Sequence, residues 1–260
     1  MITAGIDMGT QTVKIVLQKD GEALSQEKAF SGFEPTKAAK QAFEEALGKV
    51  RVSRNDIRHV TATGAGADLA PYRDSTISMV GADAKVGAHL YPSVRTVIDV
   101  GAEEARAVRC DEKGTLLNFV VNERCAAGAG TFIEAMARAL EVKLEEMGPL
   151  SLKAERASQI NATCVIFGES DVVTLIHRQE PKPEIARAIY DAMADRISSM
   201  VYRLGVNSDI ALVGGVAKDA GFVASLKRKL GIDILIPENP EFVGALGAAL
   251  VASKRAGGLT

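Results

Sequence analysis

The feature that most constrains the fold is an internal repeat. Residues 4–24, AGIDMGTQTVKIVLQKDGEAL, can be laid over residues 96–116, TVIDVGAEEARAVRCDEKGTL. Each copy has an apolar strand ending in Asp-x-Gly, a short turn, a second strand of alternating character and a turn with Asp and Gly. Two copies of one β-hairpin unit, roughly 90 residues apart, predict a duplicated α/β architecture with a cleft between its halves.

A third glycine turn lies late in the chain. Residues 210–219, IALVGGVAKD, have the pattern of a strand that runs into Gly214 and Gly215 and continues as a helix. Apolar residues with helical spacing recur between these landmarks. They are found at 36–50, 130–147 and 184–204.

The tail of the sequence bears on the domain organisation. Residues 244–257, GALGAALVASKRAG, predict a helix of small residues that packs closely against another element. We expect this helix to return to the first half of the chain. The first domain is therefore expected at 1–88 with 241–260, and the second at 89–240.

Composition excludes several classes of partner. The formal net charge is −2, which offers no electrostatic reason to bind nucleic acid or an anionic membrane. No apolar stretch approaches the ~18 residues that span a bilayer. The start, MITAGIDMG, lacks the pattern of a secretory signal, so we expect a cytoplasmic protein. There the three cysteines are core thiols, reactive groups or metal ligands rather than disulfides.

The Asp-x-Gly turns contain the candidate phosphate-binding and catalytic residues. Gly9 lets backbone N–H groups approach a phosphate, and Thr10 and Gln11 supply further hydrogen bonds. A carboxylate such as Asp7 does not bind phosphate itself and would act through Mg²⁺ or an attacking water. Asp99 repeats the arrangement in the other half. Each turn taken singly is as well explained as a hairpin, but three in this order favour a nucleotide site.

Other nucleotide motifs fit less well. No GxxxxGK[ST] occurs, so the chain is not a P-loop ATPase, and GAGAD at 64–68 is too isolated to indicate a dinucleotide. Gly214 and Gly215 would let an adenosine lie against backbone. The order of the three glycine turns resembles the acetate kinase, sugar kinase, Hsp70 and actin superfamily. That resemblance implies two ribonuclease H-like domains with ATP between them, and leaves kinase, chaperone and ATP-driven switch open.

The cysteines narrow the choice. Cys125 and Cys164 each precede a segment with helical spacing, where the helix N-terminus favours an anion such as an iron-bound thiolate. From spacing alone two such cysteines are more often buried hydrophobes. A [4Fe–4S] cluster takes four cysteines, a number that is reached if two subunits meet and each donates Cys125 and Cys164. Cys110 lies on a strand without such a setting and is interpreted as a structural thiol.

The segments CAAGAGTFIEAMARALEV and ATCVIFGESDVV closely resemble one group within that superfamily. It contains the BcrA/BcrD/BadF/BadG-type ATPases, which are activators of 2-hydroxyacyl-CoA dehydratases and ATPase subunits of benzoyl-CoA reductase. The resemblance covers essentially the whole chain. It implies an actin-like ATPase in which Cys125 and Cys164 bridge a [4Fe–4S] cluster with a second subunit of the same family.

Two departures from that group favour one member. Its activators have Gly-Gly-Gln-Asp at the second phosphate turn, where this chain has Gly101-Ala102-Glu103-Glu104. The loop ATGAGADLA also lacks the Tyr and Arg expected of an activator. A subunit of the heteromeric benzoyl-CoA reductase is therefore the preferred assignment. A homodimeric activator of a 2-hydroxyacyl-CoA dehydratase is the alternative.

The expected reaction couples ATP hydrolysis to the transfer of single low-potential electrons. Ferredoxin would donate the electron, and the catalytic subunits of an acyl-CoA reductase or dehydratase would accept it. Asp7 and Asp99 are the catalytic candidates and hold Mg²⁺ or orient water, with Asp7 the candidate Mg²⁺ ligand. The residues expected to bind ATP are Gly9, Thr10, Gln11, Lys14, Gly101, Glu103, Gly214 and Gly215.

Two rival classes remain. A small-molecule kinase would share the nucleotide turns but would need a substrate base and no iron. A non-catalytic scaffold subunit with a degenerate ATP site is the other, because Glu103 places an acidic residue at the second phosphate turn. The sequence does not identify the acyl-CoA, since that chemistry belongs to a partner.

Overall fold

The computed structural model describes residues 1–122, 130–156, 158–160, 165–205 and 209–258 of the chain. It divides into two compact units. The first comprises Met1–Arg95, Val108–Leu117 and Glu241–Thr260, and the second Thr96–Ala107 and Asn118–Pro240. The domain limits expected from the sequence, 1–88 with 241–260 and 89–240, stay a prediction.

The first unit contains a five-stranded sheet with strand order β3-β2-β1-β4-β5. The first three strands make an antiparallel meander, and β4 and β5 add to it in parallel. Their bounds are β1 Ile2–Met8, β2 Thr12–Lys19, β3 Glu22–Phe30, β4 Ile57–Thr63 and β5 Ser75–Thr76.

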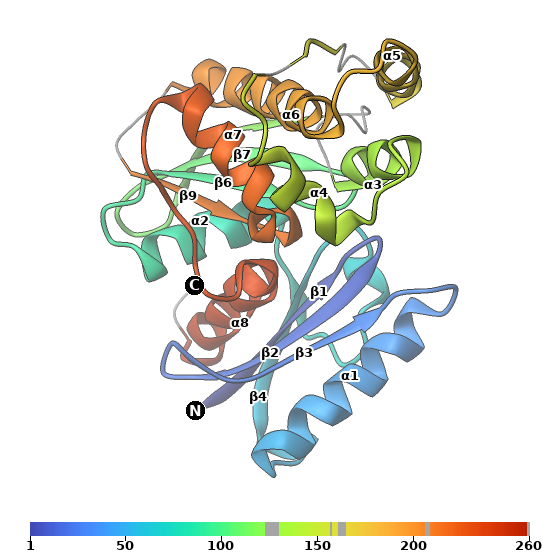
Figure 1. The fold of residues 1–260 in the computed structure, drawn as a ribbon. Coiled ribbons are helices and arrows are strands. Elements are labelled where there is room, and N and C mark those ends of the chain that lie inside the picture. The colour runs from blue at the N-terminus through green and yellow to red at the C-terminus, as the bar shows by residue number, and fades with distance from the viewer. Residues whose placement is uncertain (123–129, 157, 161–164, 206–208, 259–260) are drawn as a thin grey trace. The chain divides into compact units, whose positions relative to one another are not determined.

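Alternation along β1 decides which helix covers which face of this sheet. Ala4, Ile6 and Met8 are buried in one core with α1 (Pro35–Val50). The intervening residues face α8 (Val243–Ala256), where a Cβ on Gly5 would lie 1.9 Å from a backbone oxygen of the helix. Figure 1 shows α8 in red beside the blue strands, and α2 (Met79–Leu90) packs on α8.

The second unit repeats this topology. Its sheet has the order β10-β9-β6-β7-β8, in which β6 pairs in parallel with β9, and β9 with β10. Read from the hairpin side, each sheet is therefore a meander followed by two parallel strands, which confirms the duplicated α/β architecture. The bounds are β6 Thr96–Val100, β7 Ala105–Cys110, β8 Leu116–Val121, β9 Ile210–Val213 and β10 Ile234–Leu235.

Five described helices belong to the second unit. They are α3 Gly130–Ala139, α4 Leu144–Ser151, α5 Val165–His177, α6 Lys182–Leu204 and α7 Ala220–Leu230. The segment 130–147, expected to be helical throughout, is interrupted. Glu141 has a φ of +54°, a left-handed conformation that a helix does not accommodate, so α3 ends before it and α4 begins after it.

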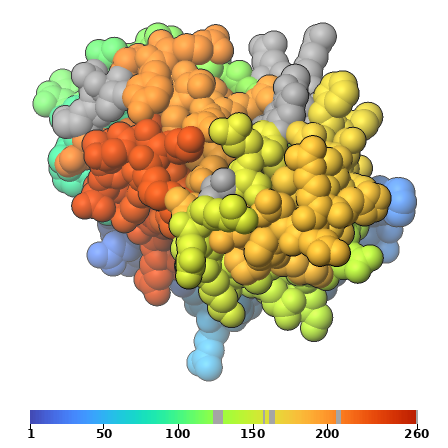
Figure 2. Space-filling model, turned by 45° about the horizontal axis from the view of Figure 1, so that its top comes forward, coloured from blue at the N-terminus to red at the C-terminus, as the bar shows by residue number. Residues whose placement is uncertain are grey.

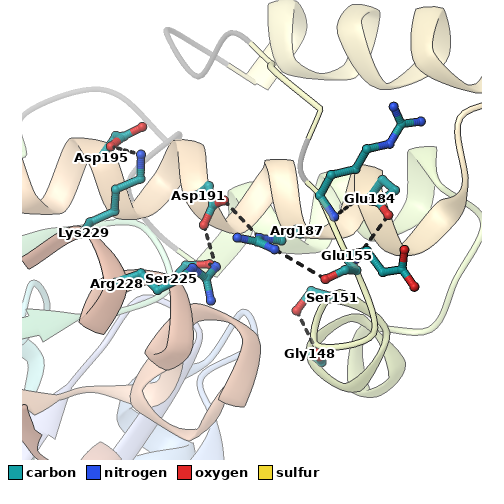
Figure 3. Close-up of polar contacts among 12 residues, drawn as sticks. Gly148, Ser151, Glu155, Glu184, Arg187, Asp191, Asp195, Ser225, Arg228 and Lys229 are labelled. Carbon is teal, nitrogen blue, oxygen red and sulfur yellow. Dashed lines mark hydrogen bonds and ion pairs between the residues drawn. The ribbon is translucent and has the colours of Figure 1, made fainter. Parts of the chain in front are cut away.

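The central helix of the second unit is α6. Its buried face carries large side chains such as Tyr190 into the core, and it packs against α7 and α4. Toward α7, Asp191 contacts Arg228 at 2.7 Å, and Asp195 contacts Lys229 of the same helix at 2.7 Å (Figure 3). Such partly exposed pairs contribute about 0–1 kcal/mol each, so the core of α6 matters more to stability.

Among the described residues, no helix combines the length and the apolar character needed to cross a bilayer.

Candidate functional site

The first carboxylate of interest, Asp7, lies near the end of β1. The antiparallel register places it opposite Lys14 of β2, and the Lys14 ammonium donates to Asp7 Oδ2 at 3.2 Å. Both side chains are mostly buried, at 17% and 16% exposed. Lys14 is among the residues predicted to bind ATP. The structure pairs the Lys14 ammonium with Asp7, and the binding of ATP by Lys14 stays a prediction.

The turn between β1 and β2 is tightly built. A Cβ on Gly9 would lie 2.7 Å from the carbonyl oxygen of Thr12 and 3.0 Å from Lys14 Nζ, so a side chain there would displace the turn or the lysine. Ser31 secures the turn from the end of β3. Its hydroxyl donates to the Gly9 carbonyl at 2.9 Å, and its backbone N–H donates to the Gln11 carbonyl at 2.9 Å. Thr10, by contrast, is exposed at the tip of the turn.

A second glycine turn of the first unit closes over the same carboxylate. Gly64 directly follows β4, has a φ of +94°, and a Cβ there would lie 2.6 Å from Asp7 Oδ1. Gly66 donates its N–H to the carbonyl of Met8 at 3.0 Å. Gly244, at the start of α8, also faces Asp7, with its Cβ position 3.4 Å from Oδ2. Asp7 thus lies among glycines, where backbone can approach closely.

The second unit contains an equivalent carboxylate. Asp99 lies on β6, opposite Val213 of the parallel strand β9, and is 8% exposed. Arg106 of β7 donates to Asp99 and also to Glu104 Oε1, the latter at 2.7 Å. Arg106 follows Asp99 by the same interval at which Lys14 follows Asp7, and β6–β7 corresponds to β1–β2. Each unit therefore pairs its carboxylate with a cation from the next strand.

The glycine turn after β9 repeats the arrangement of Gly64. Gly214 has a φ of +87°, and a Cβ there would lie 2.3 Å from Asp99 Oδ1 and 2.4 Å from the carbonyl oxygen of Val100. Its N–H donates to the carbonyl of Pro240 at 2.9 Å. Gly215 is different, because no atom lies within 4 Å of its Cβ position. Of these two glycines, Gly214 alone is required to be glycine by contacts that the structure describes.

The turn after β6 is joined to the start of α3. The Gly101 N–H donates to the Glu104 carbonyl at 2.9 Å and closes the turn. In return, the carbonyls of Gly101 and Ala102 accept the N–H groups of Gly130 and Thr131, each at 2.9 Å. Two of the N–H groups that a helix start leaves unpaired are thereby used, and the turn and α3 are held together.

Of the three cysteines, the structure describes Cys110. Cys125 and Cys164 lie outside the described residues. Helices do follow both of them, since α3 begins at Gly130 and α5 at Val165. α5, gold in Figure 2, lies at the surface with Ile166 and Phe167 exposed. Within the part of the chain that the structure covers, no group of His, Cys, Asp or Glu is arranged to hold a metal ion.

Cys110 fits the role of a structural thiol. Its side chain is 1% exposed on β7, and burial raises the pKa of the thiol above its ordinary value. A raised pKa means less reactive thiolate at neutral pH. Cys110 is therefore unreactive for two reasons: reagents do not reach its buried thiol, and little of the thiol is ionised at neutral pH.

In each unit the backbone of a glycine turn packs directly against a carboxylate. Carboxylate oxygens are the kind of ligand that Mg²⁺ prefers, so the donor set is of the type that a magnesium nucleotide needs. Two residues that contact these carboxylates were not among the predicted site residues. Gly64 follows a strand directly, which is the signal used for Gly214. Arg106 follows Asp99 by the interval at which Lys14 follows Asp7.

A duplicated sheet of this topology, with a glycine turn beside a carboxylate in each half, defines an actin-like ATPase with two ribonuclease H-like domains. The chain belongs to the BadF/BadG/BcrA/BcrD ATPase family, whose sequence profile matches residues 4–252. This confirms the family that the cysteine segments indicated.

Particular relatives are similar over nearly their whole length. The structure of the activator of 2-hydroxyisocaproyl-CoA dehydratase from Clostridium difficile with bound ADPNP superposes with a TM-score of 0.92, at 35% identity, covering 99% of this chain and 96% of that one. The activator of lactoyl-CoA dehydratase from Anaerotignum propionicum is 36% identical, covering 98% and 99%. A benzoyl-CoA reductase subunit from Thauera aromatica is 31% identical, covering 96% and 92%.

Proposed function

We propose that this chain is the ATP-dependent activator of a 2-hydroxyacyl-CoA dehydratase, which hydrolyses ATP to deliver single low-potential electrons. The observation that carries the proposal is the repeated site, a carboxylate held by a cation beside a glycine turn, in a member of this ATPase family. Identities of 35% and 36% to dehydratase activators, against 31% to the reductase subunit, support the activator over the benzoyl-CoA reductase preferred from sequence.

The second candidate is the ATPase subunit of a benzoyl-CoA reductase. It is favoured by one observation, the acidic turn Gly101-Ala102-Glu103-Glu104, which departs from the activator pattern. A subunit that works with a different partner tolerates such a change more readily than one that must act in a homodimer. The two candidates share the nucleotide chemistry and differ only in the protein that receives the electron.

ATP binding is assigned to backbone and side-chain donors at the glycine turns. Gly9, Thr10 and Gln11 serve the first turn, with Lys14 beside Asp7. Gly101 and the backbone N–H group of Glu103 serve the second turn. Gly214 and Gly215 offer backbone to the adenosine. Mg²⁺ would supply charge that neutralises the phosphates. Asp7 and Asp99, each oriented by its cation, would hold the metal or orient the attacking water.

The cluster is proposed from sequence, because its ligands Cys125 and Cys164 lie outside the described residues. A [4Fe–4S] group shared with a second subunit of the same family supplies one-electron chemistry. The chain's own contribution is the connection between the second turn and α3, through the N–H groups of Gly130 and Thr131. A change of that turn on hydrolysis would be transmitted to the helix that follows Cys125. Reduced ferredoxin is the proposed electron source.

Anaerobic purification with iron and acid-labile sulfide analysis tests the proposal first. We expect a coloured dimer with one cluster and ATPase activity. Reconstitution with a 2-hydroxyacyl-CoA dehydratase, and separately with benzoyl-CoA reductase subunits, then distinguishes the two candidates by which acyl-CoA is turned over. An iron-free protein that phosphorylates a small molecule would establish the kinase alternative instead.

The catalytic carboxylates are tested by Asp7→Asn and Asp99→Asn. Each variant is expected to lose ATP turnover by about 100-fold or more, in the range of groups that position a nucleophile or a metal. Turnover of the complex that is the same with both variants as with the wild type would show that this chain is a scaffold beside another active subunit.

A further inference from the structure

The second phosphate turn carries two carboxylates where a phosphate would have to approach. Glu103 and Glu104 follow Gly101 and Ala102, and like charges repel across a few ångströms when water is partly excluded. The first turn, Gly9-Thr10-Gln11, carries no acidic residue. If nothing offset these charges, the second turn would oppose ATP rather than bind it.

Arg106 offsets one of them. Its side chain is 9% exposed on β7, and one guanidinium nitrogen donates to Glu104 Oε1 at 2.7 Å while another donates to Asp99. A guanidinium is planar, always charged and presents five donors, so it can bind two carboxylates at once. Glu103 is exposed, where water and salt screen its charge. The acidic turn is therefore less negative than its sequence indicates.

The first unit serves as an internal comparison. There Lys14 holds Asp7 alone, at 3.2 Å, and no acidic residue of the turn needs a partner. In the second unit the equivalent position is an arginine, and the turn contains Glu104. The cation in each unit thus matches the number of carboxylates it faces: an ammonium for one, a guanidinium fork for two.

We propose that Arg106 is the positioning residue that makes the acidic turn able to take the phosphates of ATP. It holds Asp99 in place and neutralises Glu104, so that the departure from the activator pattern leaves the ATP site of this chain intact. This inference rests on the proposed ATP-binding function. It assigns Glu104 and Arg106 as a compensated pair and predicts that the subunit is not a degenerate scaffold.

The experiment measures binding of mant-ATP with Mg²⁺ to the anaerobically purified full-length protein, with unlabelled ATP, ADP and AMP as competitors. Variants are Arg106→Met, Arg106→Lys, Glu104→Gln and the double variant Arg106→Met/Glu104→Gln. Arg109→Met is the matched control, since it removes another arginine of the same strand. Circular dichroism and thermal unfolding establish that each variant is folded.

Arg106→Met is expected to weaken ATP about tenfold or more, roughly 1.4 kcal/mol, and AMP much less, because the repulsion grows with phosphate charge. Glu104→Gln alone should change ATP affinity less than about threefold. Added to Arg106→Met, it should restore most of the loss, a coupling that a double-mutant cycle reports directly. Arg106→Lys should fall between wild type and Arg106→Met, and Arg109→Met should match wild type.

The outcomes test the proposed ATP-binding function and the role of Arg106 separately. No mant-ATP binding to the wild type would refute the proposed function. ATP binding to the wild type that Arg106→Met leaves unchanged, or a loss equal for ATP and AMP and not recovered by Glu104→Gln, would refute this inference while the function stands. If Arg106→Met does not fold, Arg106→Lys is compared with wild type and with Glu104→Gln. The deciding quantity is again whether ATP affinity falls more than AMP affinity.

Discussion

Gly214 is the position where a single methyl group should be most costly. Its φ of +87° and ψ of 172° fall in a region of backbone conformation that is essentially restricted to glycine. A Cβ would also lie 2.3 Å from Asp99 Oδ1 and 2.4 Å from the Val100 carbonyl oxygen, well inside van der Waals contact. Gly214→Ala therefore has to strain the backbone and displace the end of β6 together.

The size of the effect follows from these two terms. Holding a non-glycine residue in such a conformation costs about 1–3 kcal/mol, and overpacking a rigid contact costs about 1–3 kcal/mol more. Gly214→Ala should thus destabilise the protein by roughly 2–6 kcal/mol. The adjacent Gly215→Ala is the matched control, because nothing lies within 4 Å of its Cβ position. Its cost should stay within about 0.5 kcal/mol.

Urea unfolding under anaerobic conditions measures the difference. The chain contains no tryptophan, so far-UV circular dichroism rather than indole fluorescence should follow the transition. Gly214→Ala is expected to unfold at a clearly lower urea concentration than wild type, and Gly215→Ala at nearly the same one. Equal midpoints for the two variants would refute the reasoning, since they differ only in backbone conformation and in the contacts of the added methyl.

Two further predictions concern the second sheet and the helices around it. Glu184 is 7% exposed and accepts the backbone N–H group of Glu155 at 3.2 Å (Figure 3) and that of Arg156 at 3.0 Å. Glu184→Gln, whose amide has one acceptor, should lower the free energy of unfolding by about 1.5–3 kcal/mol. Glu180→Gln should change it by less than about 0.5 kcal/mol, and equal effects of the two variants would contradict the prediction. Burial raises the pKa of the Cys110 thiol. At pH 8, iodoacetamide should therefore label Cys110 at least about tenfold more slowly in the native protein than in urea, measured by peptide mass spectrometry. Equal labelling rates would show that the thiol is accessible.

Much of the architecture could be read from local patterns. The hairpin repeat predicted the duplication because strand alternation and Asp-Gly turns depend on neighbouring residues, and the same pattern recurs in both copies. Glycine directly after a strand indicated Gly214 for the same reason. The helix expected at 130–147 was overextended, since apolar spacing continues through Glu141 although its backbone turns left-handed. Spacing reports which face is apolar and not where the backbone changes direction.

Sequence alone determined the repeat, the order of the glycine turns and the family to which the chain belongs, because these are properties of short segments. Only the tertiary structure decided that Gly64 closes over Asp7 and that Arg106 joins Asp99 to Glu104. Gly64 reaches Asp7 because β4 pairs in parallel with β1. The pairing register of two strands that are far apart in sequence depends on both of them together and cannot be taken from either one. The proposed acceptance of a phosphate at the acidic turn depends on the contact between Arg106 and Glu104, which is likewise decided by tertiary structure.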